Sequence, residues 1–323
     1  MLININKESE IPLVGCIAFG LIDRGTNILQ VRPTSVCNLK CQFCSTSANN
    51  PELHPNTFTV ELNYLLEYVK EAVSFKGKNT QIFIDSVGDP LTYKDIIPLI
   101  KGMSKLKEIS KISMVTNGTL LKDKIELLEK AGLNEINISL HSLNPEQATF
   151  LMGNPNYKLE QVLESLKEIS KTKIKLVLTP VYLPKVNDEE IPKILDLAKE
   201  LKAELGIQKY EIYKYSRKLK QAKNITYYKF YEKLKEWEKR NKQKLVLSKK
   251  DVNLEKRDSF PIKLEIGKKY KAIIKTNGWL KGQQLAVAEN RVISVLDTSN
   301  KPGDIVNIKV IENKDNLYIV KKV

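Results

Sequence analysis

Short apolar runs alternate with longer amphipathic stretches over the first two thirds of the chain. The short runs predict strands at residues 80–85, 112–115, 134–140, 174–179 and 209–213. The longer stretches repeat their apolar residues at helical spacing and predict helices at residues 59–75, 93–106, 123–131, 158–171 and 189–205. Strands that alternate with helices are typical of βα units around a parallel sheet. At least five such units in about 180 residues fit a partial (βα)₆ barrel better than an eightfold one.

Both ends of the chain have the shorter alternation of antiparallel strands. Residues 14–23 and 27–32 predict a β-hairpin around the turn Asp23-Arg24-Gly25-Thr26. Beyond residue 261 the pattern predicts a small all-β barrel, with strands at residues 269–275, 284–288, 291–295, 305–311 and 317–320. Before the barrel, residues 216–250 are basic and helical in pattern, and residues 248–260 are charged and predict a linker.

The predicted fold class is therefore α/β, a partial (βα)₆ barrel followed by a five-stranded, OB-like all-β barrel. The predicted segments are a hairpin extension at 1–33, the α/β core at 34–215, a basic helical segment with a linker at 216–257, and the β-barrel at 258–323. No apolar stretch approaches the roughly 20 residues that span a membrane. The first ten residues are too polar for a signal peptide, so we expect a cytoplasmic protein without a membrane partner.

The net charge of +15 arises almost entirely after residue 200. Residues 1–200 contain 23 Lys and Arg against 24 Asp and Glu, whereas residues 201–323 contain 30 against 14. A neutral body with a basic end indicates a polyanionic partner on one side of the molecule. The alternative is a solvated, lysine-rich surface.

Three of the 4 cysteines, Cys37, Cys41 and Cys44, fall within eight residues. Thiolates in such a group suit an iron–sulfur cluster or zinc. His54 could complete a Cys₃His zinc site, but the paired spacing of structural zinc sites is absent. Cys16 lies in an apolar predicted strand, where buried packing is expected.

Polar residues follow successive predicted strands. Ser86-Val87-Gly88-Asp89 and Thr116-Asn117-Gly118 each come after a strand, and Ser139 and His141 end the next. Because the carboxyl ends of parallel strands meet at one edge, these residues are expected to share a site. Taken singly, the glycine segments could be plain turns, and His141 a hydrogen-bonded structural histidine.

The run from Cys37 to Cys44, with an aromatic residue before its last cysteine, resembles the CxxxCxxC signature of the radical S-adenosylmethionine (SAM) superfamily. The strand-end segments follow in that family's order, and the resemblance covers about residues 30–215. It implies a [4Fe–4S] cluster on the three cysteines, whose open iron binds SAM and cleaves it reductively to a 5′-deoxyadenosyl radical. The SAM-binding residues that the resemblance implies are Phe43, Ser86, Val87, Gly88, Asp89, Thr116, Asn117, Ser139, His141 and Val181. Asp89 stands where the family usually has Glu, so the carbonyls of Ser86 and Val87 are an alternative contact.

Residues 260–323 resemble a TRAM domain, a small RNA-binding barrel. The matching segments begin at Ile266-Gly267-Lys268-Lys269-Tyr270, at Lys281-Gly282 and at Lys301-Pro302-Gly303-Asp304. The resemblance implies that lysines track phosphates and that an aromatic ring stacks on an unpaired base. The expected RNA-binding residues are Lys268, Lys269, Lys271, Lys275, Trp279 and Lys281, with Trp279 in an exposed loop. Tyr270 could equally be barrel packing.

Together these features predict a radical SAM enzyme that modifies RNA, with tRNA as the leading substrate. No cysteine follows Cys44, so a second cluster with three cysteine ligands and a covalent methyl-cysteine route are both excluded. C-methylation of an anticodon-loop nucleoside is then the leading reaction, with electrons from a flavodoxin or ferredoxin. The alternatives are a radical SAM enzyme acting on a peptide or small metabolite, and a non-catalytic RNA-binding metalloprotein. No catalytic acid or base is predicted.

Overall fold

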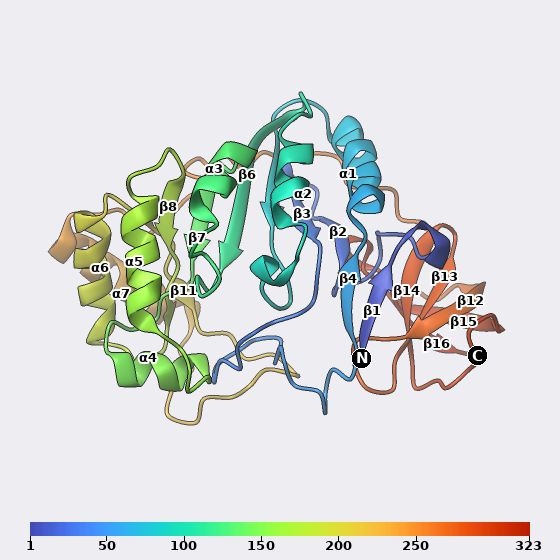
Figure 1. Ribbon diagram of the computed structural model, residues 1–323. Coiled ribbons are helices and arrows are strands. Elements are labelled where there is room, and N and C mark those ends of the chain that lie inside the picture. Colours follow the sequence, from blue (N-terminus) through green and yellow to red (C-terminus); the bar gives the residue numbers. More distant parts are fainter. The chain divides into compact units, whose positions relative to one another are not determined.

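The computed structural model describes residues 1–323, which divide into two compact units (Figure 1). The first unit comprises residues 1–37, 49–112 and 255–323, and the second comprises residues 38–48 and 113–254. The C-terminal barrel therefore belongs to the same unit as the N-terminus. None of the helices is both long and apolar enough to cross a membrane.

The α/β part of the first unit is built on β2, β3 and β5. The predicted hairpin is confirmed as antiparallel β2 and β3, and β3 pairs in parallel with β5. A separate parallel pair joins β1 to β4. The elements are β1 (Leu2–Ile5), η1 (Lys7–Ser9), β2 (Gly20–Asp23), β3 (Ile28–Arg32), β4 (Thr57–Val60), α1 (Leu62–Lys76), β5 (Thr80–Ile84), η2 (Pro90–Thr92) and α2 (Ile96–Met103). Helix α1 begins where the Glu61 side chain accepts hydrogen bonds from the backbone N–H groups of Asn63 and Tyr64.

The second unit holds parallel strands in the order β6-β7-β8-β10, as the alternation of strands and helices predicts. Strand β6 begins in the first unit and ends in the second. The elements are β6 (Ile109–Thr116), α3 (Ile125–Ala131), β7 (Glu135–Ile138), α4 (Pro145–Met152), α5 (Leu159–Ile169), β8 (Lys175–Leu178), β9 (Val181–Tyr182), α6 (Glu190–Glu200), β10 (Glu204–Leu205), β11 (Gln208–Lys209) and α7 (Tyr227–Asn241). Helix α5 buries Leu159, Val162, Leu166 and Ile169, the apolar face that its spacing predicts.

Two helices of this unit differ from the prediction. Helix α4 was missed, although its boundaries are marked in the sequence: Asn144 caps the first turn, Pro145 begins the helix and Gly153 ends it with φ +60°. The helix expected over residues 216–250 is confined to α7, because residues 216–226 run as irregular chain.

The predicted five-stranded barrel is confirmed as a closed barrel of order β12-β13-β14-β16-β15. Its strands are β12 (Lys269–Asn277), β13 (Gln284–Ala288), β14 (Arg291–Leu296), β15 (Ile305–Glu312) and β16 (Ile319–Lys322), with a short η3 (Lys314–Asn316) before the last. Along β12, Ala272 and Ile274 are buried in the barrel core while Lys269 and Lys271 are exposed. This alternation is the period-two pattern from which the strand was predicted.

N-terminal segments of the first unit are bonded directly to the barrel. The N–H of Val292 donates to the carbonyl of Val14 at 3.1 Å, and the N–H of Tyr318 donates to that of Gly15 at 3.1 Å. Gly15 has φ +131°, and a Cβ there would lie 1.8 Å from the carbonyl oxygen of Val292. Only glycine fits this approach, so the barrel is an integral part of the first unit.

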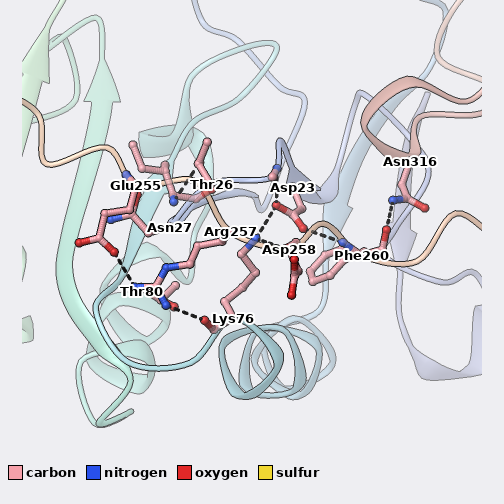
Figure 2. A network of polar contacts seen from close by, with 12 residues as sticks. Asp23, Thr26, Asn27, Lys76, Thr80, Glu255, Arg257, Asp258, Phe260 and Asn316 are labelled. Carbon is pink, nitrogen blue, oxygen red and sulfur yellow. Dashed lines mark hydrogen bonds and ion pairs between the residues drawn. The ribbon is translucent and has the colours of Figure 1, made fainter. Parts of the chain in front are cut away.

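The segment that leads into the barrel is fixed rather than free, which corrects the linker prediction for residues 255–260. Asn27 and Glu255, which lie side by side in Figure 2, exchange two hydrogen bonds, both 2.9 Å. The N–H of Arg257 donates to the carbonyl of Gly25 at 2.9 Å. Two of the charged residues that suggested a linker, Glu255 and Arg257, pair with each other at 2.6 Å.

A buried ion pair lies at the centre of that segment. Lys76 Nζ lies 2.9 Å from Asp23 Oδ1 and donates to the carbonyl of Asp258 at 2.6 Å (Figure 2). The second carboxylate oxygen of Asp23 accepts the N–H of Phe260 at 2.8 Å. A charge pair is tolerated in a core when further hydrogen bonds satisfy its donors and acceptors. Here Lys76 Nζ has a second acceptor, and both Asp23 oxygens accept a backbone N–H.

Candidate functional site

The cysteine loop is the run from Cys37 to Ala48, and its part in the second unit, residues 38–48, is held by the end of helix α4. The backbone N–H groups of Lys40 and Gln42 donate to the carbonyls of Met152 and Leu151, at 3.3 and 2.9 Å. Gly153 lets the two segments approach, because a Cβ there would lie 2.0 Å from the carbonyl oxygen of Lys40. The helix that the sequence pattern missed therefore positions the predicted ligands.

The three clustered thiols differ from Cys16 in their surroundings. Cys37, Cys41 and Cys44 are partly exposed, and none of the four cysteines is in a disulfide. Cys44 Sγ lies 3.3 Å from Thr46 Oγ1, and the N–H of Cys44 donates to the carbonyl of Cys41 at 3.2 Å. Cys16 is 2% exposed, as predicted, and burial raises the pKa of its thiol to about 11.

In the first unit, the segment Ser86–Asp89 packs against the residues that precede Cys37. Ser86 Oγ donates to the carbonyl of Thr34 at 2.5 Å, and the N–H of Asp89 donates to that of Val36 at 2.8 Å. A Cβ on Gly88 would lie 2.1 Å from the carbonyl oxygen of Val36, so glycine is required. Two candidate SAM-binding residues, Ser86 and Asp89, thus have backbone contacts next to the first cysteine.

Asp89 also has a local structural role. It is 3% exposed, and its Oδ1 accepts the N–H of Leu91 at 2.9 Å, which caps η2. The segment therefore does form the structural turn that was the alternative to a SAM-binding role. Contact of this segment with SAM stays a prediction.

In the second unit, the loop after β6 is tied to the residue that follows Cys37. Asn117 Nδ2 donates to Asn38 Oδ1 at 2.9 Å, and Asn38 Nδ2 donates to Thr119 Oγ1 at 2.7 Å. Thr119 Oγ1 in turn donates to Asn117 Oδ1 at 2.6 Å. The N–H of Ser139 donates to the carbonyl of Thr116 at 2.9 Å, so the ends of β6 and β7 lie side by side. Asn38 and Thr119 were not predicted, since neither belongs to a recognisable motif.

His141 is buried against the aromatic residue of the cysteine loop. Its ring meets that of Phe43 edge to face, with centroids 4.7 Å apart, and its Nδ1 accepts the N–H of Val181 at 3.0 Å. Burial lowers the pKa of His141 to about 3, so the imidazole is neutral with its proton on Nε2. The alternative of a hydrogen-bonded structural histidine is thus present. Contact of Phe43, His141 or Val181 with SAM is untested.

Asn187 joins the ends of β7 and β9. Its Nδ2 donates to the carbonyls of His141 and Val181, both at 3.0 Å, and its Oδ1 accepts the N–H of Leu183 at 2.7 Å. The side chain is fully buried. All its polar atoms serve to hold this end of the second unit together.

Residues 31–198 match the sequence profile described as the Radical SAM superfamily, which is just over half of the chain. This chain belongs to the radical SAM superfamily. An uncharacterised protein of Methanocaldococcus jannaschii is 34% identical over 98% of this chain and 80% of its own length. The GTP 3′,8-cyclase of Clostridium perfringens is 33% identical over 55% of this chain, and that of Aquifex aeolicus is 31% identical over 58%. The chain spans only about half the length of these cyclases, 53% and 56%.

Solved structures of low sequence identity share the fold of this radical SAM protein. SuiB of Streptococcus suis superposes with a TM-score of 0.55 at 20% identity, over 75% of this chain and 51% of its own. TYW1 with a lysine-pyruvate adduct bound superposes with a TM-score of 0.51 at 19% identity, over 72% of this chain and 80% of its own.

The cofactors of a radical SAM enzyme are a [4Fe–4S] cluster and SAM, and the donor set here fits them. Three partly exposed thiols in one loop, Cys37, Cys41 and Cys44, would hold the cluster and leave one iron for SAM. When bound, the pair supplies one-electron cleavage of SAM and a carbon radical able to take hydrogen from a C–H bond. The apolar cluster of Phe43, Leu151, Leu183, Tyr210 and Leu219 excludes water from this side of the loop.

The predicted RNA-binding residues of the barrel divide into two groups. Lys268, Lys269, Lys271 and Lys281 are exposed, and Lys268 pairs with Glu265 at 2.9 Å. Lys275 is mostly covered and pairs with Glu10 at 2.5 Å. Lys269, Lys271 and Lys281 are therefore available to an anion, while Lys268 is exposed but has an acidic partner.

The expectation that Trp279 lies in an exposed loop was wrong. Its side chain is 8% exposed and stacks on His54, with centroids 3.9 Å apart and an interplanar angle of 11°. Asn56 Nδ2 donates to the carbonyl of Gly278 at 2.9 Å, which closes the turn onto the loop that carries His54. His54 lies more than 220 residues from Trp279, so the sequence around Trp279 does not indicate this contact. His54, the candidate zinc ligand, has a packing role here.

Proposed function

We propose that this radical SAM enzyme modifies RNA, with tRNA as the leading substrate. The observation that carries the proposal is a basic, aromatic surface on residues 213–242 of the second unit. These residues include eleven Lys and Arg but only three Glu. Five tyrosines among them are exposed, Tyr213 (59%), Tyr215 (40%), Tyr227 (57%), Tyr228 (71%) and Tyr231 (44%). Exposed rings interleaved with lysines are typical of surfaces that bind unpaired bases and the adjacent phosphates.

The surface is contiguous with the cysteine loop. Ser216 Oγ donates to the carbonyl of Ser45 at 2.9 Å, and Ser47 Oγ donates to the carbonyl of Tyr215 at 2.5 Å. The segment that presents Tyr213 and Tyr215 is therefore hydrogen-bonded to the residues that follow Cys44. A base stacked there would lie near the predicted cluster ligands.

Helix α7 presents the rest of the surface because it is amphipathic. It buries Phe230, Leu234 and Trp237 on one face, and the Trp237 ring meets that of Tyr182 with centroids 5.0 Å apart. Its exposed residues include Tyr227, Tyr228 and Tyr231 together with Lys229 and Lys235. Anchoring one face of the helix keeps the other face in a fixed orientation toward solvent.

Cations already lie over two of the exposed rings. Lys209 Nζ is 4.9 Å from the centroid of the Tyr227 ring, and Lys214 Nζ is 5.0 Å from that of Tyr215. Lys209 is itself covered and paired with Glu211 at 3.2 Å, so it fixes the Tyr227 ring, whereas Lys214 places a charge for a phosphate beside the Tyr215 ring. The exposed barrel lysines of the first unit, Lys268, Lys269, Lys271 and Lys281, are separate candidates for contact with phosphates.

For the reaction, we infer a carbon-centred modification, with C-methylation of an anticodon-loop nucleoside as the leading case. Apart from Cys37, Cys41 and Cys44 these 323 residues contain only Cys16, so they do not supply three ligands for a second cluster of the kind used for sulfur insertion. Unpaired anticodon-loop bases can enter a site without the cost of opening a duplex. A flavodoxin or ferredoxin would supply the electron.

A second candidate substrate is a free purine nucleotide, favoured by the similarity to GTP 3′,8-cyclases. The two candidates separate in one assay. The anaerobically reconstituted enzyme is given SAM and dithionite, with either total tRNA or GTP, and 5′-deoxyadenosine is measured. We expect tRNA to stimulate its formation and GTP to leave it unchanged. Stimulation by GTP alone would replace the RNA proposal with a nucleotide one.

A further inference from the structure

Arg217 makes a cluster of contacts with the cysteine loop from outside the segment that matches the superfamily profile. Its N–H donates to the carbonyl of Cys44 at 2.9 Å, and its Nη1 donates to that of Cys41 at 3.2 Å. Its Nη2 donates to the carbonyl of Ser47 at 3.4 Å and also to that of Ala48. One residue thus binds four carbonyls of a loop about 170 positions earlier in the chain.

The loop itself is not part of a helix or strand. Residues 41–48 form turns, in which the N–H of Cys44 donates to the carbonyl of Cys41 at 3.2 Å and the N–H of Ser47 donates to that of Cys44 at 3.3 Å. A planar guanidinium with several donors in a fixed fork can bind carbonyls at both ends of the loop together, which a single ammonium cannot. The contacts therefore fix the separation between Cys41 and Ala48, the span that includes Cys44.

The segment that carries Arg217 is itself anchored. Ser216 Oγ donates to the carbonyl of Ser45, and the N–H of Leu219 donates to the hydroxyl of Tyr210 at 3.0 Å. Leu219 is buried in the apolar cluster that contains Phe43. Arg217 is thus held on both sides, and its side chain is partly buried.

We propose that Arg217 is a positioning residue for the [4Fe–4S] cluster. It holds the loop so that Cys41 and Cys44 keep the orientation in which they bind iron. It also places a permanent positive charge beside the loop that carries two ligating thiolates. A nearby cation stabilises the reduced cluster, which has one more negative charge, so it raises the reduction potential. The proposal depends on the cofactor of the superfamily and not on the identity of the substrate.

The test compares Arg217→Gln with Arg240→Gln, which removes the same charge from an exposed position on α7. Both proteins are reconstituted anaerobically. Iron loss to a chelator, the EPR spectrum of the reduced cluster and its midpoint potential are then measured. We expect Arg217→Gln to lose iron about tenfold faster, equivalent to one charge-assisted hydrogen bond. Its potential should be more negative and its EPR signal altered, while Arg240→Gln should match the wild type.

Arg217→Lys separates the two roles, and it replaces the Gln variant if that protein folds poorly. Lysine keeps the charge but cannot bind carbonyls at both ends of the loop. For Arg217→Lys we expect the midpoint potential of the wild-type cluster, but iron loss that is still faster than in the wild type. Iron loss and EPR spectra equal to wild type in both Arg217 variants would overturn the proposal.

Discussion

Lys76 Nζ lies 2.9 Å from Asp23 Oδ1, and neither side chain has any exposed area. The pair joins helix α1 to the end of β2, and both partners also bind the segment that enters the C-terminal barrel (Figure 2). The first unit is therefore assembled from segments more than 180 residues apart.

Lys76→Met should destabilise the first unit strongly, because it leaves the Asp23 carboxylate buried without its cation. The expected loss is about 3–5 kcal/mol in the free energy of unfolding, measured by chemical denaturation. Lys78→Met changes an exposed lysine two residues beyond the end of the same helix; it is the control and should change the free energy of unfolding by less than about 0.5 kcal/mol. Equal effects of the two substitutions would show that the ion pair contributes no stability.

Each of Cys37→Ala, Cys41→Ala and Cys44→Ala should abolish the cluster, whereas Cys16→Ala should retain it. Cys16 is buried, and its thiol, with a pKa of about 11, stays protonated near pH 7. A cysteine that binds a metal must instead be a thiolate. Iron and sulfide per chain, counted after anaerobic reconstitution, give the answer. A complete cluster in Cys41→Ala, or its loss only in Cys16→Ala, would exclude the proposed ligands.

His141 should make the protein less stable as the pH falls. Its pKa of about 3 in the folded state lies below the value near 6.5 in the unfolded chain. Between these values only the unfolded state binds the proton, so stability present above pH 6.5 is lost on acidification. We expect a loss of about 2 kcal/mol from this residue between pH 7 and pH 5. His141→Gln should have a shallower pH dependence in urea denaturation; an unchanged slope would refute the assignment.

Tyr228→Ala should weaken RNA binding, because this ring is the most exposed of the surface on residues 213–242. The loss of one stacked base is expected to cost about 1–3 kcal/mol in binding free energy. Affinity for tRNA is measured by fluorescence anisotropy at several salt concentrations. The control is Leu127→Ala, an exposed apolar residue of α3 in the same unit. Unchanged affinity in Tyr228→Ala, Tyr215→Ala and their combination would remove this surface from the account.

The architecture could be predicted from the sequence because burial repeats locally. The hairpin, the βα units and the five barrel strands each bury one face at a period of two or 3.6 residues, and each appeared near its predicted position. The short helix α4 was missed because its eight residues have only a weak apolar face, although Asn144 and Gly153 marked its ends.

Contacts between distant segments could not be predicted in this way. Trp279 was placed in solvent because Asn277-Gly278 resembles an exposed turn, and nothing nearby announces His54. The charges of residues 255–260 suggested a linker, and did not indicate the hydrogen bonds that fix this segment. The sequence did not distinguish Arg217, which binds the cysteine loop, from the other basic residues near it. In each case the role depends on a partner more than 160 residues away, and only the folded chain identifies it.

The central claim is that radical SAM chemistry at the cysteine loop acts on RNA. It is tested most directly by incubating the reconstituted enzyme with tRNA from a strain that lacks the gene, a reductant and SAM deuterated at its methyl group. Nucleosides are then analysed by mass spectrometry, with Cys41→Ala as the inactive control. The account predicts one nucleoside that gains a labelled methyl group, and formation of 5′-deoxyadenosine, only with the wild-type enzyme. An altered but unlabelled nucleoside would exclude methylation and leave the action on RNA standing. Cleavage of SAM with every nucleoside unchanged would contradict the claim that the enzyme acts on RNA.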